Sequence, residues 1–578
     1  MAHLVLVATL LIWSFSFLAA ARLRQDVALV GPATPRWRAR RGEPRMRTTL
    51  ALLLLAFAAP PGMPAAGQDL DLVIRGGRLV DGTGGPWVRA DVAVKGDTIV
   101  AVRPRIDAVA RRTIDATGRV IAPGFVDIHT HARHGLFEAP AAENYVRQGV
   151  TTLVEGQDGS SPLPLGAFLD RVAALRTAVN VASLVGHGSV REAVMGRGDR
   201  APSAAELARM EDLVREAMRE GAFGLSTGLF YVPGTFARTD EVIALARVAG
   251  VMGGIHVSHM RDEAGGVVAS VRETIAIGEE GRLPTQVTHH KIIGRAGWGR
   301  STETLRLLAE ARCRGVDATI DAYPYTASST TLAAALFPAW ALEGGAGVVR
   351  RRLESPAVRA RVREVVLDKI RNERGGGDPA NIRIAACGFD PSLEGKSLAG
   401  ILAGRGLEPT VENAADLALE IVARGGASGV FHAIAEEDVA RILASPLTMV
   451  ASDGEIPVFG RGAPHPRSYG TFARVLGVYV REKGLLTLEE AVRKMTSFPA
   501  ARLGLADRGL VRPGMKADLV LFDPATIRDR ATFEKPHQYA EGVSLVVVNG
   551  EIVLDGDRLT AARPGRVLRG PAFVASAP

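Results

Sequence analysis

Short apolar segments alternate with helix-forming sequence through the middle of the chain. The apolar segments read TTLVEG, NVASLVGHG, AFGLSTG, GGIHVSHM, PTQVTHHK, DATIDAYPY and PLTMVASDG. Helix-forming stretches lie among them, and one of these, Ser203–Gly221, opens with an N-cap serine and closes with a glycine. Parallel strands need crossover connections of this kind. The repetition therefore predicts a parallel (β/α)8 barrel of the TIM type, expected over residues 123–499.

Strand-like sequence without intervening helix-forming stretches lies near both ends of the chain. Residues 68–122 contain apolar or alternating runs broken by Gly and Asp, and similar runs return within residues 500–578. The second set includes Asn549-Gly550, a dipeptide typical of a two-residue hairpin turn. We predict that the two ends form one small β-sandwich domain.

The length of the chain, 578 residues, exceeds what one ordinary core can organise, which fits a large domain beside a smaller one. The regular alternation is interrupted at about residues 342–424, a segment rich in Arg, Glu and Gly. We interpret this segment as an insertion near the mouth of the barrel, where the functional loops of this fold lie.

Residues 1–67 are interpreted as a leader outside the fold. From Met46 the sequence has an Arg, an apolar run of about ten residues and small residues at Ala65-Ala66-Gly67, the three-part pattern of a secretory signal peptide. We predict that translation starts at Met46, that residues 1–45 come from an over-extended reading frame and that residues 46–67 are removed on export. The alternative is a membrane anchor at residues 4–21, barely long enough to span a bilayer. The expected location is periplasmic or secreted, with no stable membrane span after processing.

The net charge of +8 does not indicate a nucleic-acid partner. Residues 1–67 hold eight arginines against two acidic residues, which leaves 62 of the 70 basic and 60 of the 62 acidic residues in the remainder. The basic excess therefore belongs to the leader, and the mature chain lacks the basic patch that nucleic-acid binding needs. The two cysteines, Cys313 and Cys387, support neither a disulfide framework nor a cysteine zinc site.

Polar side chains with metal-ligating chemistry follow the ends of five predicted barrel strands. Functional groups of parallel barrels lie at these carboxyl ends. Imidazoles and carboxylates are good zinc ligands, and a cluster of this size is costly to bury without a cation. His129 and His131 stand two apart on one strand, so both side chains are expected to face the interior. The complete set of candidates is His129, His131, Asp158, His259, His289 and Asp453.

The remaining histidines near these motifs are interpreted as core, surface or supporting residues. His289 and His290 are adjacent in the sequence, so their side chains point to opposite sides of a strand and only one can be a ligand. The others in this class are His134, His187, His256 and His465.

Seven motifs together carry a resemblance to a known family. The stretches GFVDIHTH and ASDG resemble the amidohydrolase superfamily. The stretches GLSTGLFYVPG, HMRDE, THHKIIG, DAYPYTASST and PHPRSYGTF narrow the resemblance to the N-acyl-D-amino-acid deacylases, or D-aminoacylases. The motifs stand in family order, and the resemblance covers about residues 69–560.

This resemblance implies zinc-dependent hydrolysis of N-acyl-D-amino acids to a carboxylate and a free D-amino acid. His259 and His289 match the histidines that hold the tighter zinc ion, and His129 and His131 match the pair after the first strand; a second, weaker zinc site stays open. Asp453 matches the catalytic aspartate. The substrate-facing positions implied by the family are Lys291, Tyr323 and Arg467, of which Arg467 would hold the substrate carboxylate.

One position departs from the family pattern. The best-known D-aminoacylases carry a cysteine ligand in a GNCG stretch, whereas this chain reads GQDG and places Asp158 there. A carboxylate also ligates zinc, but it is a harder ligand than a thiolate. Glu155 is the alternative carboxylate ligand at this place.

Two alternatives to deacylation stay open at this level. The first is another amidohydrolase reaction, such as dipeptide, cyclic-amide or carbamate hydrolysis. Relatives that hydrolyse cyclic amides bridge two metals with a carboxylated lysine, and no lysine occurs between Lys95 and Lys291. The second is a non-catalytic scaffold, which would be expected to have lost ligands that this chain keeps. The side chain of the substrate and the oligomeric state are not decided by the sequence.

Overall fold

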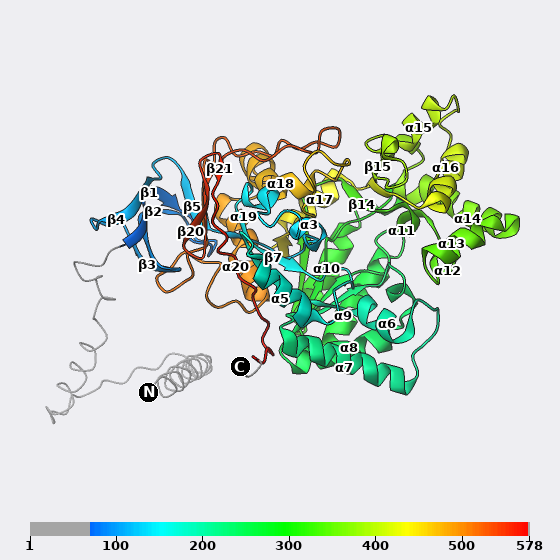
Figure 1. Ribbon diagram of the computed structural model, residues 1–578, viewed down its shortest axis with the longest axis horizontal. Coiled ribbons are helices and arrows are strands. Elements are labelled where there is room, and N and C mark those ends of the chain that lie inside the picture. The colour runs from blue at the N-terminus through cyan, green and yellow to red at the C-terminus, as the bar shows by residue number, and fades with distance from the viewer. Residues whose placement is uncertain (1–69, 576–578) are drawn as a thin grey trace, which may run out of the picture. The chain divides into compact units, whose positions relative to one another are not determined.

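The computed structural model describes residues 70–575 (Figure 1). The predicted leader, residues 1–67, lies outside the described residues. Within the described part, no helix is both long enough and apolar enough to cross a membrane.

A ring of parallel strands forms the centre of the described structure. Every neighbouring pair in the sheets β6-β7-β8 and β9-β10-β11-β12-β13-β17 runs parallel. Only Leu184 separates β8 from β9, so one segment joins the two sheets. The strands are β6 (Phe125–Asp127), β7 (Val150–Glu155), β8 (Asn180–Ser183), β9 (Val185–Gly186), β10 (Gly224–Gly228), β11 (Ile255–His259), β12 (Thr285–Val287), β13 (Ala318–Ala322) and β17 (Thr448–Val450).

The first and last barrel strands are connected just beyond their carboxyl ends. Thr130 pairs in parallel with Gly454. The backbone N–H of His131 donates to the Gly454 carbonyl at 2.7 Å, and that of Asp453 donates to the His129 carbonyl at 2.9 Å. These bonds bring the loops after β6 and β17 together, and the strand order is that of the predicted (β/α)8 barrel.

Helices follow the barrel strands, and their ends are set by local sequence. Ser203 caps helix α7 by accepting from the N–H of Glu206, whose side chain returns a bond to the Ser203 N–H, and Gly221 ends the helix at φ 114°. This confirms the helix predicted there, and such a cap contributes about 1 kcal/mol. The helices are α5 (Leu165–Leu175), α6 (His187–Met195), α7 (Ala204–Glu220), α8 (Thr239–Val251), α9 (Val267–Gly281), α10 (Ser301–Cys313), α17 (Glu436–Ala444), α18 (Arg467–Arg474), α19 (Leu488–Met495) and α20 (Ser497–Arg502).

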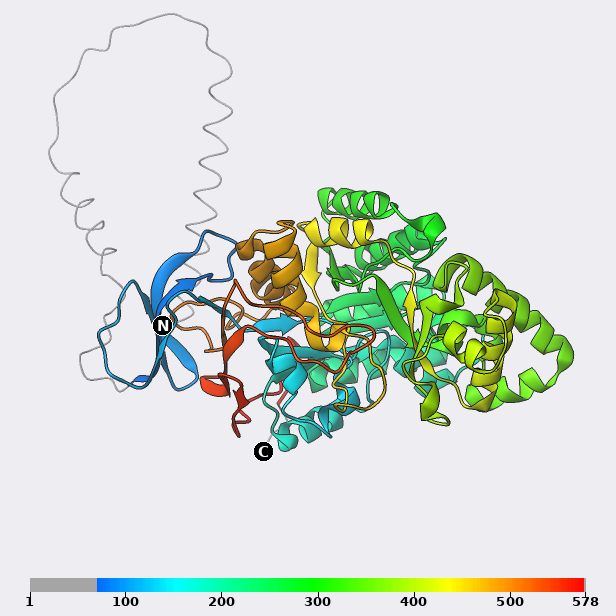
Figure 2. The same ribbon diagram turned by 90° about the horizontal axis from the view of Figure 1, so that it is seen from above.

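Strands from both ends of the described chain form one nine-stranded sheet, in which β18 pairs with β5. Figures 1 and 2 show the blue amino-terminal strands beside the red carboxyl-terminal ones. Asn549 and Gly550 join β19 to β20 with φ angles of 46° and 85°, as the predicted hairpin turn requires. The strands are β1 (Leu70–Leu79), β2 (Val88–Lys95), β3 (Thr98–Arg103), β4 (Ala110–Asp115), β5 (Val120–Pro123), β18 (Leu519–Phe522), β19 (Val543–Val548), β20 (Glu551–Asp555) and β21 (Arg558–Leu559).

The chain after β21 returns to the barrel. Gly565 donates its N–H to the Thr177 carbonyl at 2.9 Å, and Leu568 donates to the Val181 carbonyl of β8 at 2.8 Å. Residues assigned to the small domain by sequence thus extend onto the barrel itself.

A separate group of elements stands between β13 and β17. Strands β14 and β15 both pair with β16 in antiparallel fashion, and the helices around them share their own apolar core. The predicted insertion at residues 342–424 lies within this group, which begins earlier. Its elements are β14 (Ala327–Thr331), α11 (Leu332–Leu336), α12 (Ala339–Leu342), α13 (Ala346–Glu354), α14 (Pro356–Asp368), the π-helix η3 (Lys369–Arg374), β15 (Ile382–Ala386), α15 (Leu398–Gly404), α16 (Val411–Arg424) and β16 (Ser428–His432).

Candidate metal centre

Five loops at the carboxyl ends of barrel strands bring the six candidate ligands together. Strand β11 ends at His259 itself, whereas the other candidates follow the ends of their strands by two or more residues. The sequence predicted that His129 and His131 lie on a strand. The hydrogen-bonded strand instead ends at Asp127, because the backbone beyond it pairs with the loop after β17.

The first group of ligand atoms comprises His129, His131, Asp158 and Asp453, which could hold one metal ion. One carboxylate oxygen of Asp453, Oδ1, lies 3.4 Å from Nε2 of His129 and 3.1 Å from Nε2 of His131. The Asp158 carboxylate lies 3.5 Å from each of the same two imidazole nitrogens. The four side chains therefore converge on one small volume at the barrel mouth.

The second group comprises Asp158, His259 and His289. Nδ1 of His259 lies 3.2 Å from Asp158 Oδ2, and Nε2 of His289 lies 3.4 Å from Asp158 Oδ1. The two imidazole nitrogens are 2.7 Å apart. Asp158 belongs to both groups, so its two oxygens stand between two adjacent positions where an ion could bind.

Three of the candidate ligands lie on unusual backbone. Asp158, His289 and Asp453 have φ angles of 56°, 34° and 52°, in the left-handed region that side chains other than glycine rarely adopt. Such conformations cost of order 1–3 kcal/mol each and persist where surrounding structure enforces them. The fold therefore maintains strained backbone in order to direct these side chains.

The electrostatics of the cluster fit a bound divalent cation. Among the described residues, His129 Nε2, Asp158 Oδ1 and His259 Nε2 are buried without a hydrogen-bond partner. Burial acts to raise the pKa of the Asp158 carboxyl, but the neighbouring histidines, His259 first, hold that pKa well below its usual value. An ionised, buried carboxylate among imidazoles with free nitrogens is a donor set suited to zinc.

The three predicted substrate-facing residues line the same region and are all buried. Arg467 donates from Nη1 to Oδ2 of Asp453 at 2.6 Å, and its guanidinium lies 5.0 Å from the centre of the Tyr323 ring. Lys291 Nζ lies 2.7 Å from His289 Nδ1. The Tyr323 hydroxyl is buried without a partner in the described part of the chain, and burial raises its pKa well above the usual value.

Glu263 lies beside the candidate ligands, and the sequence did not single it out. Its carboxylate accepts a bond from Lys291 and lies 3.2 Å from His289 Nδ1, the nitrogen that faces away from Asp158. A carboxylate beside the outer nitrogen of a candidate ligand histidine helps to hold the ring in place. The signal lay in the HMRDE motif, but an acidic residue in a loop after a strand has the pattern of an ordinary surface charge.

The other histidines and Glu155 lie outside both groups. His290 turns away from its neighbour His289 and lies 2.7 Å from the Thr304 hydroxyl. His187 lies 3.0 Å from the Glu241 carboxylate. Glu155 accepts from the Thr130 hydroxyl at 2.6 Å and belongs to neither ligand group. This leaves Asp158 as the carboxylate that faces the candidate metal positions.

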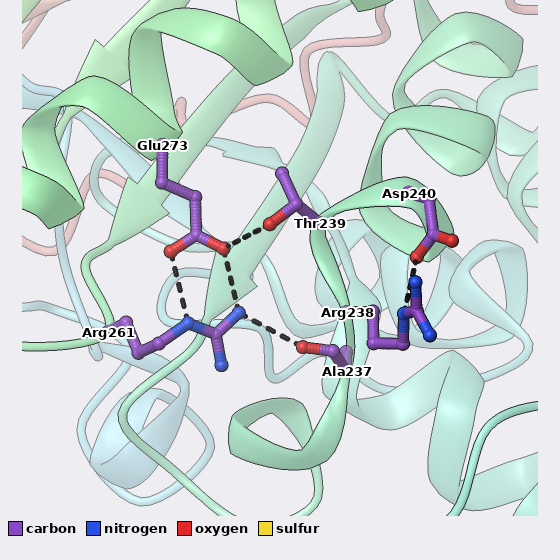
Figure 3. A pocket seen from close by; sticks show the side chains of 6 residues that line it. All are labelled: Ala237, Arg238, Thr239, Asp240, Arg261 and Glu273. Atoms are coloured by element: carbon purple, nitrogen blue, oxygen red, sulfur yellow. Dashed lines mark hydrogen bonds and ion pairs between the residues drawn. The ribbon is translucent and has the colours of Figure 1, made fainter.

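A surface pocket beside β11 is lined in part by Arg261, from the loop that follows His259 (Figure 3). There Arg261 donates to both carboxylate oxygens of Glu273, at 3.0 and 2.8 Å, and to the carbonyls of Thr235 and Ala237. Arg261 stands two residues after His259, so these bonds tie the loop after β11 to helix α9. The polar groups of this pocket bind one another and hold the loop that follows His259 and carries Glu263.

The model of the amidohydrolase family matches residues 112–554. The chain belongs to the amidohydrolase family. The D-aminoacylase of Alcaligenes xylosoxydans xylosoxydans is 39% identical to this amidohydrolase over 524 residues, which cover 87% of this chain and 98% of that protein. The N-acyl-D-glutamate deacylase of the same organism is 38% identical over 533 residues, which cover 88% of this chain and 99% of that protein.

A solved structure also resembles this amidohydrolase over most of its length. It is the N-acyl-D-glutamate deacylase from Bordetella bronchiseptica, complexed with zinc and a phosphonate inhibitor that mimics the tetrahedral intermediate of the reaction. The TM-score is 0.74 at 38% identity, and the match covers 87% of this chain and 100% of that one. The family, the fold class and the hydrolase class predicted from the sequence are confirmed.

Proposed function

We propose that this amidohydrolase is a zinc-dependent N-acyl-D-amino-acid deacylase that releases a carboxylate and a free D-amino acid. The observation that carries the proposal is the position of Asp453. One of its oxygens faces the ligand histidines and the other is bound to Arg467. A group that can move a proton thus stands between a metal site and a cation that can hold a carboxylate. The D-aminoacylase relative, aligned over nearly its whole length, supports the same reaction class.

The residues that would hold the tighter zinc ion are Asp158, His259 and His289. His129 and His131, with Asp158 and Asp453, would form a second, weaker position. A bound zinc ion supplies Lewis-acid chemistry, lowering the pKa of a bound water to about 7 and polarising a carbonyl. The donor set is entirely nitrogen and oxygen, since Asp158 stands where the family resemblance implies a cysteine.

Asp453 would act as the general base and then as the general acid. It takes a proton from the attacking water and gives it to the amine nitrogen as the amide bond breaks. Burial acts to raise the pKa of Asp453, but Arg467 and the histidines, His129 first, hold it well below the usual value. The carboxylate is therefore ionised and able to accept a proton before turnover.

Arg467, Lys291 and Tyr323 would orient the substrate. The Arg467 guanidinium can hold the α-carboxylate by paired hydrogen bonds once substrate enters. Lys291 adds a second positive charge, and Glu263 fixes its position. The Tyr323 hydroxyl keeps its proton, because burial raises its pKa, and can donate to the developing oxyanion.

The test is a screen of N-acetyl-D- and N-acetyl-L-amino acids with zinc present, in which release of the free amine is measured. The proposal expects turnover of D-substrates and little or none of their L-enantiomers. Preference for L-substrates, or hydrolysis of dihydropyrimidines or dipeptides in place of N-acetyl-D-amino acids, would refute it.

We also propose that the mature enzyme works outside the cytoplasm, in the periplasm or after secretion. The support is the signal-peptide pattern from Met46 onward, in residues outside the described structure. Amino-terminal sequencing of the protein isolated from its native cell tests this, and an intact segment of residues 1–45 would contradict it.

A further inference from the structure

Arg374 is a buried cation whose charge is not paired by any carboxylate in the described part of the chain. Arg374 is the last residue of the π-helix η3 and is 3% exposed. Within residues 70–575 no carboxylate forms an ion pair with it. Its Nη1 donates to the Ser328 hydroxyl at a long 3.4 Å, and its Nε is buried without an acceptor.

The position of Arg374 is at the mouth of the barrel. Its guanidinium lies 5.1 Å from the centre of the Phe230 ring, and that ring stacks on His259 with a centroid distance of 5.5 Å. The backbone of η3 packs against Gly294, five residues after His289, so closely that a Cβ there would lie 2.7 Å from the Asn372 carbonyl oxygen. The arginine therefore stands over the loops that carry the ligand histidines.

A buried charge without a partner is costly, so its retention requires a compensating interaction. The Phe230 ring supplies a cation–π contact, but the remaining guanidinium donors need an acceptor. The positive charge also reaches the Tyr323 phenol, where it opposes the rise in pKa that burial causes. An anion bound between Phe230 and Tyr323 would balance the charge of Arg374 and accept hydrogen bonds from its guanidinium.

We propose that Arg374 binds the side-chain carboxylate of the substrate, and that the preferred substrates are N-acyl-D-amino acids with acidic side chains. This inference rests on the proposed function. Arg467, beside Asp453, would hold the α-carboxylate, and Arg374, one aromatic ring beyond His259, would hold the second carboxylate. Relatives of both specificities are about equally similar to the chain, the D-aminoacylase at 39% identity and the N-acyl-D-glutamate deacylase at 38%.

The test compares kcat/KM for N-acetyl-D-glutamate with that for N-acetyl-D-glutamine, which has nearly the same shape without the charge. N-acetyl-D-aspartate and N-acetyl-D-leucine complete the series. The variants are Arg374→Leu and Arg374→Lys. Arg371→Leu is the matched control, because Arg371 belongs to the same π-helix but binds the exposed Glu412.

We expect the wild-type enzyme to favour the glutamate over the glutamine substrate by about 100-fold, the size of effect that a desolvated charge pair gives. Arg374→Leu should bring this ratio close to one, Arg374→Lys should keep part of it, and Arg371→Leu should keep all of it. Because the readout is a ratio within one preparation, partial misfolding of a variant does not alter it.

A second measurement needs no variant. Free D-glutamate, the product, should inhibit wild-type turnover of N-acetyl-D-glutamine at lower concentration than D-glutamine does. A wild-type ratio near one, equal inhibition by the two products, or an unchanged ratio in Arg374→Leu would overturn the role of Arg374 while deacylation of neutral D-substrates stands. Absence of hydrolysis with every N-acetyl-D-amino acid would overturn the proposed function and this inference with it.

Discussion

Arg467 donates a hydrogen bond of 2.6 Å to Oδ2 of Asp453, and both side chains are buried. The bond leaves Oδ1 of Asp453 facing the histidine pair after β6. This contact orients the Asp453 carboxylate and links it to the proposed carboxylate site, and together with the neighbouring histidines it keeps Asp453 ionised.

Replacing Asp453 by asparagine should remove the proton-transfer group without removing the tighter metal position. We expect kcat to fall by about 1,000-fold, because general acid–base catalysis contributes on this scale. Zinc analysis of the purified variant should still find metal, since Asp158, His259 and His289 form a group that does not include Asp453. Full activity in this variant would show that another residue moves the proton.

Asp158 should matter for both metal positions, because its carboxylate belongs to both ligand groups. We expect Asp158→Asn to weaken zinc binding at least 10-fold at both positions, whereas His131→Ala should affect one position only. Asp158→Cys should retain zinc, because a thiolate is also a good zinc ligand. Competition titrations with a zinc chelator measure each affinity, and unchanged binding in Asp158→Asn would place the shared ligand elsewhere.

Glu263 should act by positioning His289 and Lys291. We expect Glu263→Gln to weaken zinc binding by about 10-fold, since removal of a carboxylate behind a ligand histidine typically costs this much or more. Glu279→Gln is a matched control, because that residue lies on the exposed side of α9, 3.8 Å from Arg314. Equal zinc affinity in the two variants would contradict the positioning role.

The ion pair between Arg191 and Glu241 should stabilise the barrel in a pH-dependent way. Glu241 Oε2 lies 2.5 Å from the fully buried Arg191, and Oε1 lies 3.0 Å from His187. Glu241→Gln leaves the arginine charge unpaired, so the free energy of unfolding near pH 7 should fall by about 3 kcal/mol.

The sign of the pH dependence follows from the direction of the shift. Burial acts to raise the pKa of Glu241, but His187 and Arg191 lower that pKa overall. A lowered folded-state pKa stabilises the fold above the unfolded value, about 4.3, and that contribution is lost as pH falls through the folded value. Denaturant unfolding at pH 7 and at pH 4 should show the gap between wild type and Glu241→Gln narrowing at the lower pH; a gap that widens would contradict this assignment.

Much of the barrel follows directly from the sequence. Its strands are short segments in which every residue is buried, as expected where both faces of a parallel sheet are covered. Local sequence signals set other boundaries. Helix α7 begins after the Ser203 cap and ends at Gly221, and Asn549-Gly550 forms the turn between β19 and β20. These features depend on residues that are adjacent in the chain, so they can be recognised in the sequence.

The rest depends on contacts between distant segments. The return of Gly565–Leu568 to β8 uses backbone hydrogen bonds, which leave no side-chain pattern. Glu263 and Arg374 belong to residue types that are mostly exposed, and only the packing around them shows that they are buried. The sharing of Asp158 between two ligand groups is likewise a matter of geometry and not of spacing.

The most direct measurement is the activity of the metal-free enzyme during titration with zinc, assayed in parallel with the D- and L-enantiomers of one N-acetyl-amino acid. The enantiomers of N-acetyl-glutamate are assayed first, and those of N-acetyl-leucine provide the comparison with a neutral side chain. We expect no turnover without metal and a return of activity toward the D-enantiomer as the first equivalent of zinc binds. Full activity in the metal-free protein, or restored activity that favours the L-enantiomer, would contradict the proposed function.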